Sequence, residues 1–299
     1  MATIHIPVML EECLKALEVR SGGLYLDGTL GGGSHTAALL EGCAPKGRVW
    51  SLDVNAKALE AANTRFETEL AAKRWQGIES NFRRMDVVAH EEKIPQLDGV
   101  LLDLGLSSDE IQDPEKGLSF QIDGPLDMRL GPASNEDGTT AFDIVNRWSE
   151  TELRELIREI GEERLAGRIA TAIVTARKGH PLTRTLELAD VIVNAVPRNY
   201  EHGRIHPATR TFQALRIAVN DELGALSSAI QAAWNILKVG GVLTIISFHS
   251  LEDRVPKFAF REPHWKALYK RPLVPTEEEI KRNPRSRSAK LRAAVKVQI

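Results

Sequence analysis

The 299-residue sequence predicts an α/β protein in which a mainly parallel sheet is interrupted by a helical insertion. Three observations favour this fold. Short apolar runs alternate with helical segments up to Ser108, the alternation then stops, and a further apolar run follows near residue 242. Strands that are spaced by helices pair in parallel through right-handed crossovers, so the two ends of the chain should share one sheet.

The early strands have a common pattern, a short apolar run that ends in an acidic residue. Residues 24–27, 48–53 and 97–103 follow it, and residues 55–70 between the second and third runs read as a helix. A late strand is expected at 242–246, directly after a Gly-Gly turn. All four strands should therefore belong to the same sheet.

The middle of the chain predicts loops and helices. Residues 109–141 are rich in Gly, Pro and Asp, as loops are. In the helical pattern that follows, Leu165, Ile169 and Ile173 recur every four residues and predict one apolar face. Three helices are expected in this part and just after it, at 150–178, 186–196 and 209–237. Pro197 ends the second of them.

The simplest domain organisation is one sheet domain in two parts, 1–108 and 209–299, with the insertion at 109–208. The net charge of −2 hides an asymmetry between these parts. Residues 254–299 hold 13 Lys/Arg and 4 Asp/Glu, and no acid follows Lys281. Such a basic C-terminal tail can meet a polyanion such as nucleic acid, although a solvated, partly floppy terminus fits the charge equally well.

The composition excludes several classes of protein. With 42% hydrophobic and 27% charged residues the chain is an ordinary globular one, and no stretch approaches the ~20 apolar residues of a membrane helix. The N-terminus lacks the pattern of a secretory signal. Cys13 and Cys43, with no CxxC motif, fit a reducing compartment and exclude a disulfide scaffold or a cysteine-built zinc site. We therefore expect a cytoplasmic protein.

A glycine-rich loop, 27–35, is the first candidate for binding. It follows a strand and precedes a helix, at the sheet edge where open α/β sheets bind ligands. The glycine spacing does not match the G-x-G-x-x-G motif of dinucleotide-binding proteins, because Thr36 occupies the position of the third glycine. The loop is also not a Walker A phosphate-binding loop, because no Gly-Lys-Ser/Thr follows it. Adenosine binding without a pyrophosphate fits better, and a glycine turn with no ligand fits equally well.

Two acidic strand ends strengthen the case for a site at this edge. Asp53 lies 20 residues after Gly33, and a carboxylate there can accept both hydroxyl hydrogens of a ribose. Asp103 ends the third strand and opens a loop with Ser107 and Ser108, whose polar groups could orient a substrate amine. Alternatively, these side chains satisfy only their own backbone.

Two further polar clusters are the segments 123–129 and 247–254. The second contains Ser247, His249 and Asp253, which suggests a hydrolase triad. However, the chain has no G-x-S-x-G elbow, and residues this close along one chain rarely point at each other. His249 is therefore more readily a structural or substrate-contacting histidine.

Taken together, these blocks resemble one family, the bacterial 16S ribosomal RNA (cytosine-N4) methyltransferases known as RsmH/MraW. The similarity runs from His5 nearly to Arg292, and the blocks come in the family order. They are the segments 5–10, 27–35, 102–108, 123–129, 183–185, 206–216, 247–254 and 283–288.

The resemblance implies a Rossmann-like, S-adenosylmethionine (AdoMet)-dependent methyltransferase sheet with a helical substrate-recognition insertion. It also implies cofactor-binding residues by their positions in the matching blocks. Ser34 stands where the family often has glycine, and Glu110 where it usually has glutamine. The implied cofactor contacts are Gly33, Ser34 and His35 in the loop, Asp53 at the ribose, Phe82 beside the adenine, Asp103 near the methionine end, and Glu110.

The implied reaction transfers a methyl group to the exocyclic amine of one cytosine in the decoding region of the small ribosomal subunit. AdoMet is already an activated donor, so the protein needs chiefly to align the groups, without a metal. Asp103, Asp127 and His249 are the candidate catalytic residues, and Arg210 and Arg285 are candidates for binding phosphate. The oligomeric state, monomer or homodimer, stays open.

Two other functions remain compatible with part of the sequence. A nicotinamide dehydrogenase would share the sheet and Asp53, but the glycine spacing argues against it. A non-catalytic RNA-binding or assembly factor with a vestigial pocket would bind RNA without methyl transfer, although an intact loop, Asp53 and Asp103 argue against it.

Overall fold

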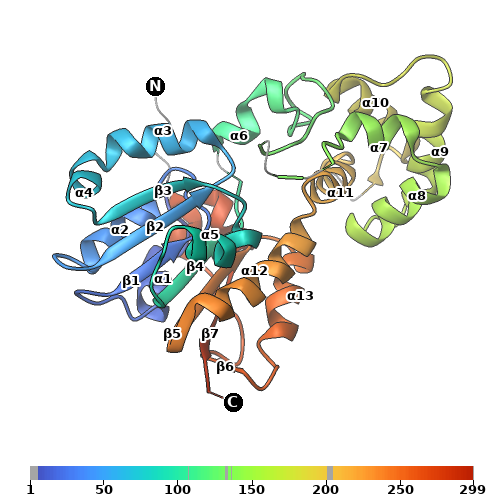
Figure 1. The fold of residues 1–299 in the computed structure, drawn as a ribbon. Helices are drawn as coiled ribbons and strands as arrows, with labels where there is room; N and C mark the ends of the chain where they lie inside the picture. Colours follow the sequence, from blue (N-terminus) through green and yellow to red (C-terminus); the bar gives the residue numbers. More distant parts are fainter. Residues whose placement is uncertain (1–5, 107, 132–133, 136, 201–204, 299) are drawn as a thin grey trace. The chain divides into compact units, whose positions relative to one another are not determined.

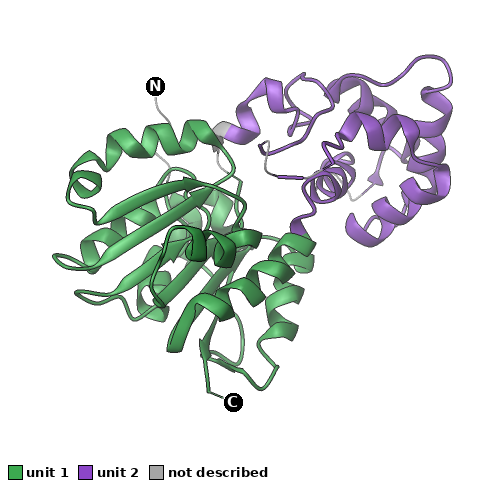
Figure 2. Cartoon of the chain, in the orientation of Figure 1, with its two compact units in different colours: residues 1–107, 223–299 green, residues 108–222 purple. Residues whose placement is uncertain are grey.

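The computed structural model describes residues 6–106, 108–131, 134–135, 137–200 and 205–298. His5 and Ser107, which belong to two of the matching blocks, lie outside the described residues. The chain divides into two compact units, residues 1–107 with 223–299 and residues 108–222 (Figure 2). The second unit thus extends beyond 208, where the sequence placed the end of the insertion, and includes the next helix.

The first unit is built on one seven-stranded sheet with the order β3-β2-β1-β4-β5-β7-β6 (Figure 1). Neighbouring strands from β3 to β5 are parallel, whereas β7 is antiparallel to both β5 and β6. The predicted α/β fold class is confirmed. The strands are β1 Leu24–Asp27, β2 Arg48–Asp53, β3 Trp75–Glu79, β4 Leu97–Asp103, β5 Leu237–Ser247, β6 Trp265–Ala267 and β7 Lys290–Lys296.

Helices cover both faces of this sheet because side chains alternate between the faces along each strand. In β4, Leu101 packs with α1, α2 and α3, while Val100 and Leu102 pack with α5 and α12. The helices of this unit are α1 Leu10–Ala16, α2 Ser34–Gly42, α3 Ala56–Arg65, α4 Glu67–Ala71, the 3₁₀ turn η1 Phe82–Arg84, α5 Met85–Glu91, α12 Glu222–Ile236, α13 Ser250–Ala259, α14 Glu277–Arg282 and the 3₁₀ turn η5 Pro284–Ser288.

The second unit is helical and has its own core, as the periodicity around Ile169 and Ile173 predicts. Its helix starts are well capped, since Thr140 with Asp143 and Ser149 with Glu152 both form capping boxes. Its elements are α6 Ser108–Gln112, η2 Pro114–Lys116, α7 Ala141–Arg147, α8 Glu150–Glu155, the π-helical turn η3 Leu156–Ile160, α9 Ala166–Ala176, α10 Thr185–Ala195 and α11 Thr209–Asn220.

Two expected helices are broken in the structure. The segment 150–178 contains α8, η3 and α9 rather than one helix. The segment 209–237 contains α11 and α12, which are separated at Asp221. Asp221 has φ 46°, a left-handed conformation that terminates a helix and that periodicity does not reveal. The late strand also begins earlier than expected, at Leu237.

The basic C-terminal segment is folded. The alternative that it is a solvated, partly flexible terminus is therefore wrong. It contains α14, η5 and β7, and β7 lies inside the sheet between β5 and β6 rather than at its edge. Arg292 and Lys290 bind the carboxylate of Asp253, and Lys296 donates to the carbonyls of Trp234 and Leu237. Several of the basic residues are therefore structural.

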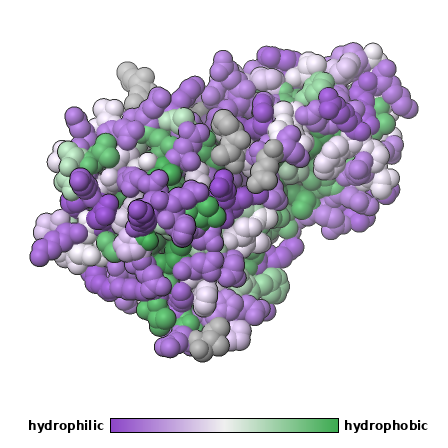
Figure 3. All heavy atoms as spheres, in the orientation of Figure 1, coloured by the Kyte–Doolittle hydropathy of each residue, from purple (hydrophilic) through white to green (hydrophobic). Residues whose placement is uncertain are grey.

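The described helices include none that is long and apolar enough to cross a membrane. The face drawn in Figure 3 carries mostly hydrophilic residues with smaller hydrophobic patches between them.

Candidate functional site

The glycine loop is tied to the strands on both sides of β1. The Gly28 N–H donates to Leu101 O in β4, and the Leu30 N–H donates to Leu52 O in β2. Asp27, the fully buried last residue of β1, accepts hydrogen bonds from the Thr29 N–H at 3.1 Å and from the Thr36 hydroxyl at 2.7 Å. The loop is thus a fixed rim at the carboxyl ends of the strands.

The loop needs glycine at particular positions. Gly33, which precedes α2, has φ 73°, and a Cβ there would lie 3.1 Å from the Phe66 ring. At Gly28 a Cβ would lie 2.5 Å from the side chain of Leu102 and 3.2 Å from Cβ of Phe82. Phe82, the first residue of η1, is therefore close to the start of the loop.

Asp53 is held with its carboxylate towards the glycine loop. Its Oδ2 accepts from the Gly31 N–H and its Oδ1 from the Asn55 N–H, both at 2.8 Å. These bonds fix the orientation of the carboxylate at the end of β2, and each carboxylate oxygen can accept more than one hydrogen bond. The arrangement fits a polyhydroxylated ligand such as a ribose beside the loop.

Asp103 is joined to the same loop from the other side. Its N–H donates to Thr29 Oγ1 at 2.7 Å, and its Oδ1 accepts from the Gly105 N–H at 3.3 Å. The Nδ1 atom of His35 lies 3.7 Å from Asp103 Oδ2. The structure therefore brings Asp53 and Asp103 together around one loop, as their strand-end positions predict, and Phe82 lies beside the same loop.

His35 itself is a buried residue of α2. Its Nε2 lies 3.1 Å from Val8 O, and because a carbonyl oxygen only accepts, Nε2 donates to it. Its side chain links the segment before α1 to Asp103, and this contact suits a positioning role. Ser34, beside it, is the first residue of α2.

His249 follows β5 and caps helix α13. Its Nδ1 accepts from the Glu252 N–H at 3.3 Å, and Glu252 Oε2 accepts in return from the Phe248 N–H at 2.7 Å. His249 Nε2 lies 3.0 Å from Glu252 Oε1, although not in the orientation of a hydrogen bond. A Cβ at Gly105 would lie 2.9 Å from the Phe248 ring, so the His249 segment borders the loop after Asp103.

Asp253 does not form a triad with this histidine. Its carboxylate is bound by Arg292 at 2.6 and 3.2 Å, with Lys290 at 3.5 Å. Burial acts to raise the pKa of Asp253, but the hydrogen bonds and charges of Arg292 and Lys290 outweigh it and lower the pKa. The hydrolase interpretation of this segment is therefore wrong.

In the second unit, Asp127 forms a bidentate ion pair with Arg129. Its Oδ1 accepts from Arg129 Nε at 2.8 Å and its Oδ2 from Nη2 at 2.7 Å. Burial acts to raise the pKa of Asp127, but the hydrogen bonds from Arg129 and its charge outweigh it, so the pKa is lowered. Asp127 thus presents an oriented carboxylate whose charge is partly compensated.

The other candidates in this unit also have partners. Glu110 forms an ion pair with Lys116 at 3.1 Å, and Lys116 Nζ also donates to Leu130 O. Arg210 lies 3.7 Å from the carboxylate of Glu163, which is almost completely buried. The charge of Arg210 therefore compensates a buried acid. Arg210 is accordingly a weaker candidate for binding phosphate.

Sequence reasoning missed two contributors to these sites, namely Asp27 and Thr29. Asp27 and Thr29 stand in the glycine loop, and their roles as anchors depend on partners in α2 and β4.

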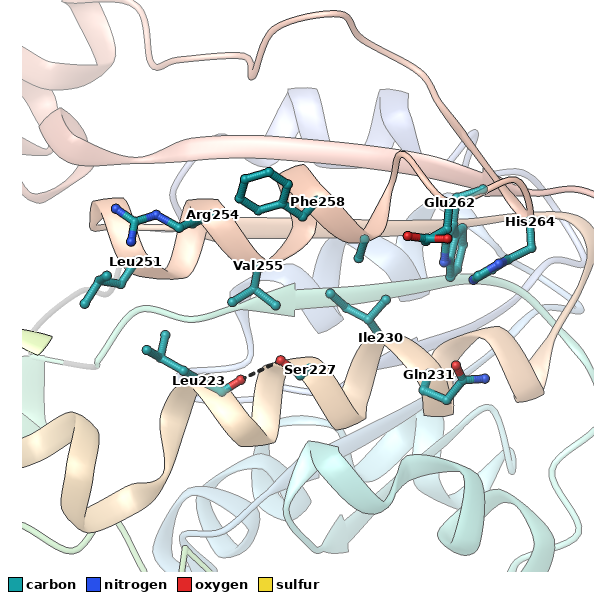
Figure 4. A pocket seen from close by; sticks show the side chains of 12 residues that line it. Leu223, Ser227, Ile230, Gln231, Leu251, Arg254, Val255, Phe258, Glu262 and His264 are labelled. Atoms are coloured by element: carbon teal, nitrogen blue, oxygen red, sulfur yellow. Dashed lines mark hydrogen bonds between the residues drawn. The ribbon is translucent and has the colours of Figure 1, made fainter. Parts of the chain in front are cut away.

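A separate apolar hollow of about 520 Å³ lies between α12 and α13 (Figure 4). Its lining includes Ile230, Val255 and Phe258, and it contains no residue of the glycine loop. It belongs to the helical layer of the unit rather than to the carboxyl edge of the sheet.

Sequence comparison decides the family. The model described as the MraW methylase family matches residues 2–297. This chain belongs to that family. The resemblance inferred from the motif blocks is thus confirmed. The chain is accordingly a methylase, and S-adenosylmethionine is its methyl donor.

Curated relatives of this MraW chain share one name, "Ribosomal RNA small subunit methyltransferase H". The protein of this name from Synechococcus sp. is 48% identical over 98% of this chain and 92% of its own length. Those from Pelobacter propionicus and Syntrophus aciditrophicus are 46% and 44% identical, each over 98% of both chains. A solved rRNA methylase from Streptococcus thermophilus has a TM-score of 0.46 at 14% identity, covering 99% of this chain and 100% of its own.

Proposed function

We propose that this protein methylates the exocyclic N4 amine of a cytosine in the decoding region of 16S ribosomal RNA, with AdoMet as donor. The observation that carries the proposal is the pair of acids, Asp53 and Asp103, which are bonded to opposite sides of one glycine loop. The shared name of the relatives supports small-subunit RNA as the substrate. The family resemblance of the motif blocks supports the cytosine amine.

The residues around the loop fit an adenosine-containing cofactor. Asp53 would accept the ribose hydroxyls, and Phe82 would contact the adenine. Gly33 and Ser34 would let the cofactor approach the start of α2. Asp103 would bind the amino group at the methionine end, and His35 would hold Asp103 in place. Glu110 is proposed as a further contact, with its charge compensated by Lys116.

The bound AdoMet supplies a methyl group on a sulfonium, which needs no further activation. The cytosine amine is a poor nucleophile because its lone pair is delocalised into the ring. Asp103 would accept a hydrogen bond from the amine, localise that lone pair and align the nitrogen with the methyl group. The surplus proton can leave after transfer, so no strong base is needed.

Asp127 and His249 are the proposed substrate-side residues. Arg129 orients the carboxylate of Asp127 as an acceptor. His249 caps α13 through Nδ1, and its Nε2 is buried 3.0 Å from Glu252 Oε1, so His249 would act by positioning the substrate-side segment after β5. The unit 108–222 would recognise the RNA, while the sheet unit holds the cofactor. The target cytosine must be unpaired or flipped out, because a duplex would hide its amine. The partner is the small ribosomal subunit in the cytoplasm.

The decisive experiment is methyl transfer from labelled AdoMet to small subunits that lack the modification, followed by mapping of the modified base. The expected product is one N4-methylcytosine in the decoding region. RNA binding without transfer would favour the assembly-factor interpretation instead. A melting temperature that rises with NAD but not with AdoMet would favour a dehydrogenase.

A further inference from the structure

Seven of the 13 basic residues of segment 254–299 fall into two groups. Arg292, Lys290 and Lys296 have the structural partners described above. Lys257, Arg261, Lys270 and Arg271 are exposed instead, and all four line one hollow of about 350 Å³. This hollow lies in the first unit, between the end of α13 and the segment that follows β6.

The hollow carries an uncompensated positive charge. None of its lining residues is acidic. Within the described part of the chain, no carboxylate lies within 4.0 Å of a side-chain nitrogen of Lys257, Arg261, Lys270 or Arg271. Arg292 also lines the hollow, but Asp253 neutralises it. Four unpaired cations around a concave surface favour an anionic ligand.

An exposed aromatic ring lies beside the hollow. Phe258, on α13, is 53% exposed, an unusual fraction for a phenylalanine. It lines the apolar hollow between α12 and α13 (Figure 4) and borders the basic hollow through its neighbours Lys257 and Arg261. Arg261 lies 5.2 Å and Lys257 5.9 Å from the centre of its ring. Aromatic rings next to cations are the surfaces on which single-stranded nucleic acids stack their bases. The ligand is thus better matched by a polynucleotide than by a free anion.

The hollow is also close to the proposed catalytic edge. In the sheet register Asp103 pairs with Ile246, and Ile246 pairs with Leu291, the neighbour of Arg292. Because adjacent strands are about 4.8 Å apart, Leu291 lies roughly 10 Å from Asp103, and the lining residues Arg292 and Ala293 lie one and two positions further along β7, away from that edge. An RNA strand with its target base at Asp103 would therefore reach the hollow within a few nucleotides.

We propose that the hollow of Lys257, Arg261, Lys270 and Arg271 binds the phosphodiester backbone of the RNA segment that flanks the target cytosine, with a base stacked on Phe258. This inference rests on the proposed function, since it assumes an RNA substrate. It adds a binding site in the sheet unit, outside the helical insertion.

The test uses the double variant Arg261→Gln/Arg271→Gln. Binding to unmethylated small subunits is measured from 50 to 200 mM salt. Each lost contact to single-stranded phosphate should lower the slope of log affinity against log salt by about 0.7, hence about 1.4 for two. The wild-type protein should then lose about seven-fold more affinity than the variant over this range. KM for subunits should rise while kcat stays unchanged.

The matched control is Lys46→Gln/Lys73→Gln, which removes two exposed cations before β2 and β3 and should keep the wild-type slope. Phe258→Leu should weaken RNA binding about five-fold or more without changing the slope, since no charge is lost. AdoMet affinity and the melting temperature should stay at wild-type values in all three variants.

Two results separate the proposals. If the wild-type protein methylates subunits and Arg261→Gln/Arg271→Gln keeps the wild-type slope, the hollow is not an RNA site and the proposed function stands. If the wild-type protein transfers no methyl group but the slope falls as expected, the RNA site stands and the proposed function is wrong.

Discussion

Replacing Asp53 by alanine should weaken AdoMet binding by about 1–3 kcal/mol, or about 5- to 150-fold in Kd. The structure suggests two sources for this loss. The first is the hydrogen bonding of the carboxylate to the ribose hydroxyls. The second is the anchoring of the loop, because Asp53 accepts the N–H groups of Gly31 and Asn55 at 2.8 Å.

The magnitude follows from the kind of bond that is lost. A hydrogen bond to a charged group contributes about 1.5–3 kcal/mol, and Asp53 is only half-buried, so water replaces part of that contribution. The variant Asp53→Asn keeps the size of the side chain but loses its charge, and its amide nitrogen cannot accept the backbone N–H that one carboxylate oxygen accepts now. It should therefore also bind AdoMet more weakly than the wild-type protein.

The assay is isothermal calorimetry of AdoMet binding, with thermal unfolding to show that each variant is folded. Glu60→Ala is the matched control, because it removes an exposed acid from the following helix, α3. An Asp53→Ala protein that is folded and binds AdoMet with wild-type affinity would refute the assignment of Asp53 to the cofactor site.

Three further predictions concern the insertion and the C-terminal strand. Asp127→Ala should strongly reduce the rate of methyl transfer, while calorimetry shows near wild-type AdoMet affinity. A wild-type rate of methyl transfer would show that the loop 123–129 has a structural role only. Deletion of 281–299 should abolish cooperative folding, measured by circular dichroism, because it removes β7 from inside the sheet; a wild-type melting curve would contradict this. Asp253→Ala should cost about 3 kcal/mol in urea unfolding, because it leaves Arg292 without its partner. Since the pKa of Asp253 is lowered by folding, its contribution is present above the unfolded pKa of about 3.9 and is lost as the pH falls through the folded pKa. A variant that unfolds like the wild-type protein at pH 7 would contradict the last prediction.

The sequence by itself determined the local features of this protein. The acid-ended strands at Asp27, Asp53 and Asp103 were correct to the residue, because a buried parallel strand must be apolar and its polar end marks the sheet edge. The break of the helix at Asp221 was not predicted, because Asp221 lies within an otherwise continuous helical pattern. Motif blocks along the whole chain were enough to identify the MraW family.

Only the tertiary structure decided which charges are paired. By charge alone, residues 254–299 form one basic tail. In the folded protein, Arg292 and Lys290 form ion pairs with Asp253, and the side chain of Lys296 is buried in the sheet unit. Arg261 and Arg271 are exposed and line one hollow. The partners lie about 40 to 60 residues apart along the chain, so no local pattern reveals them. Charge pairing depends on distances of a few ångströms in space, and only the packing of strands and helices sets those distances.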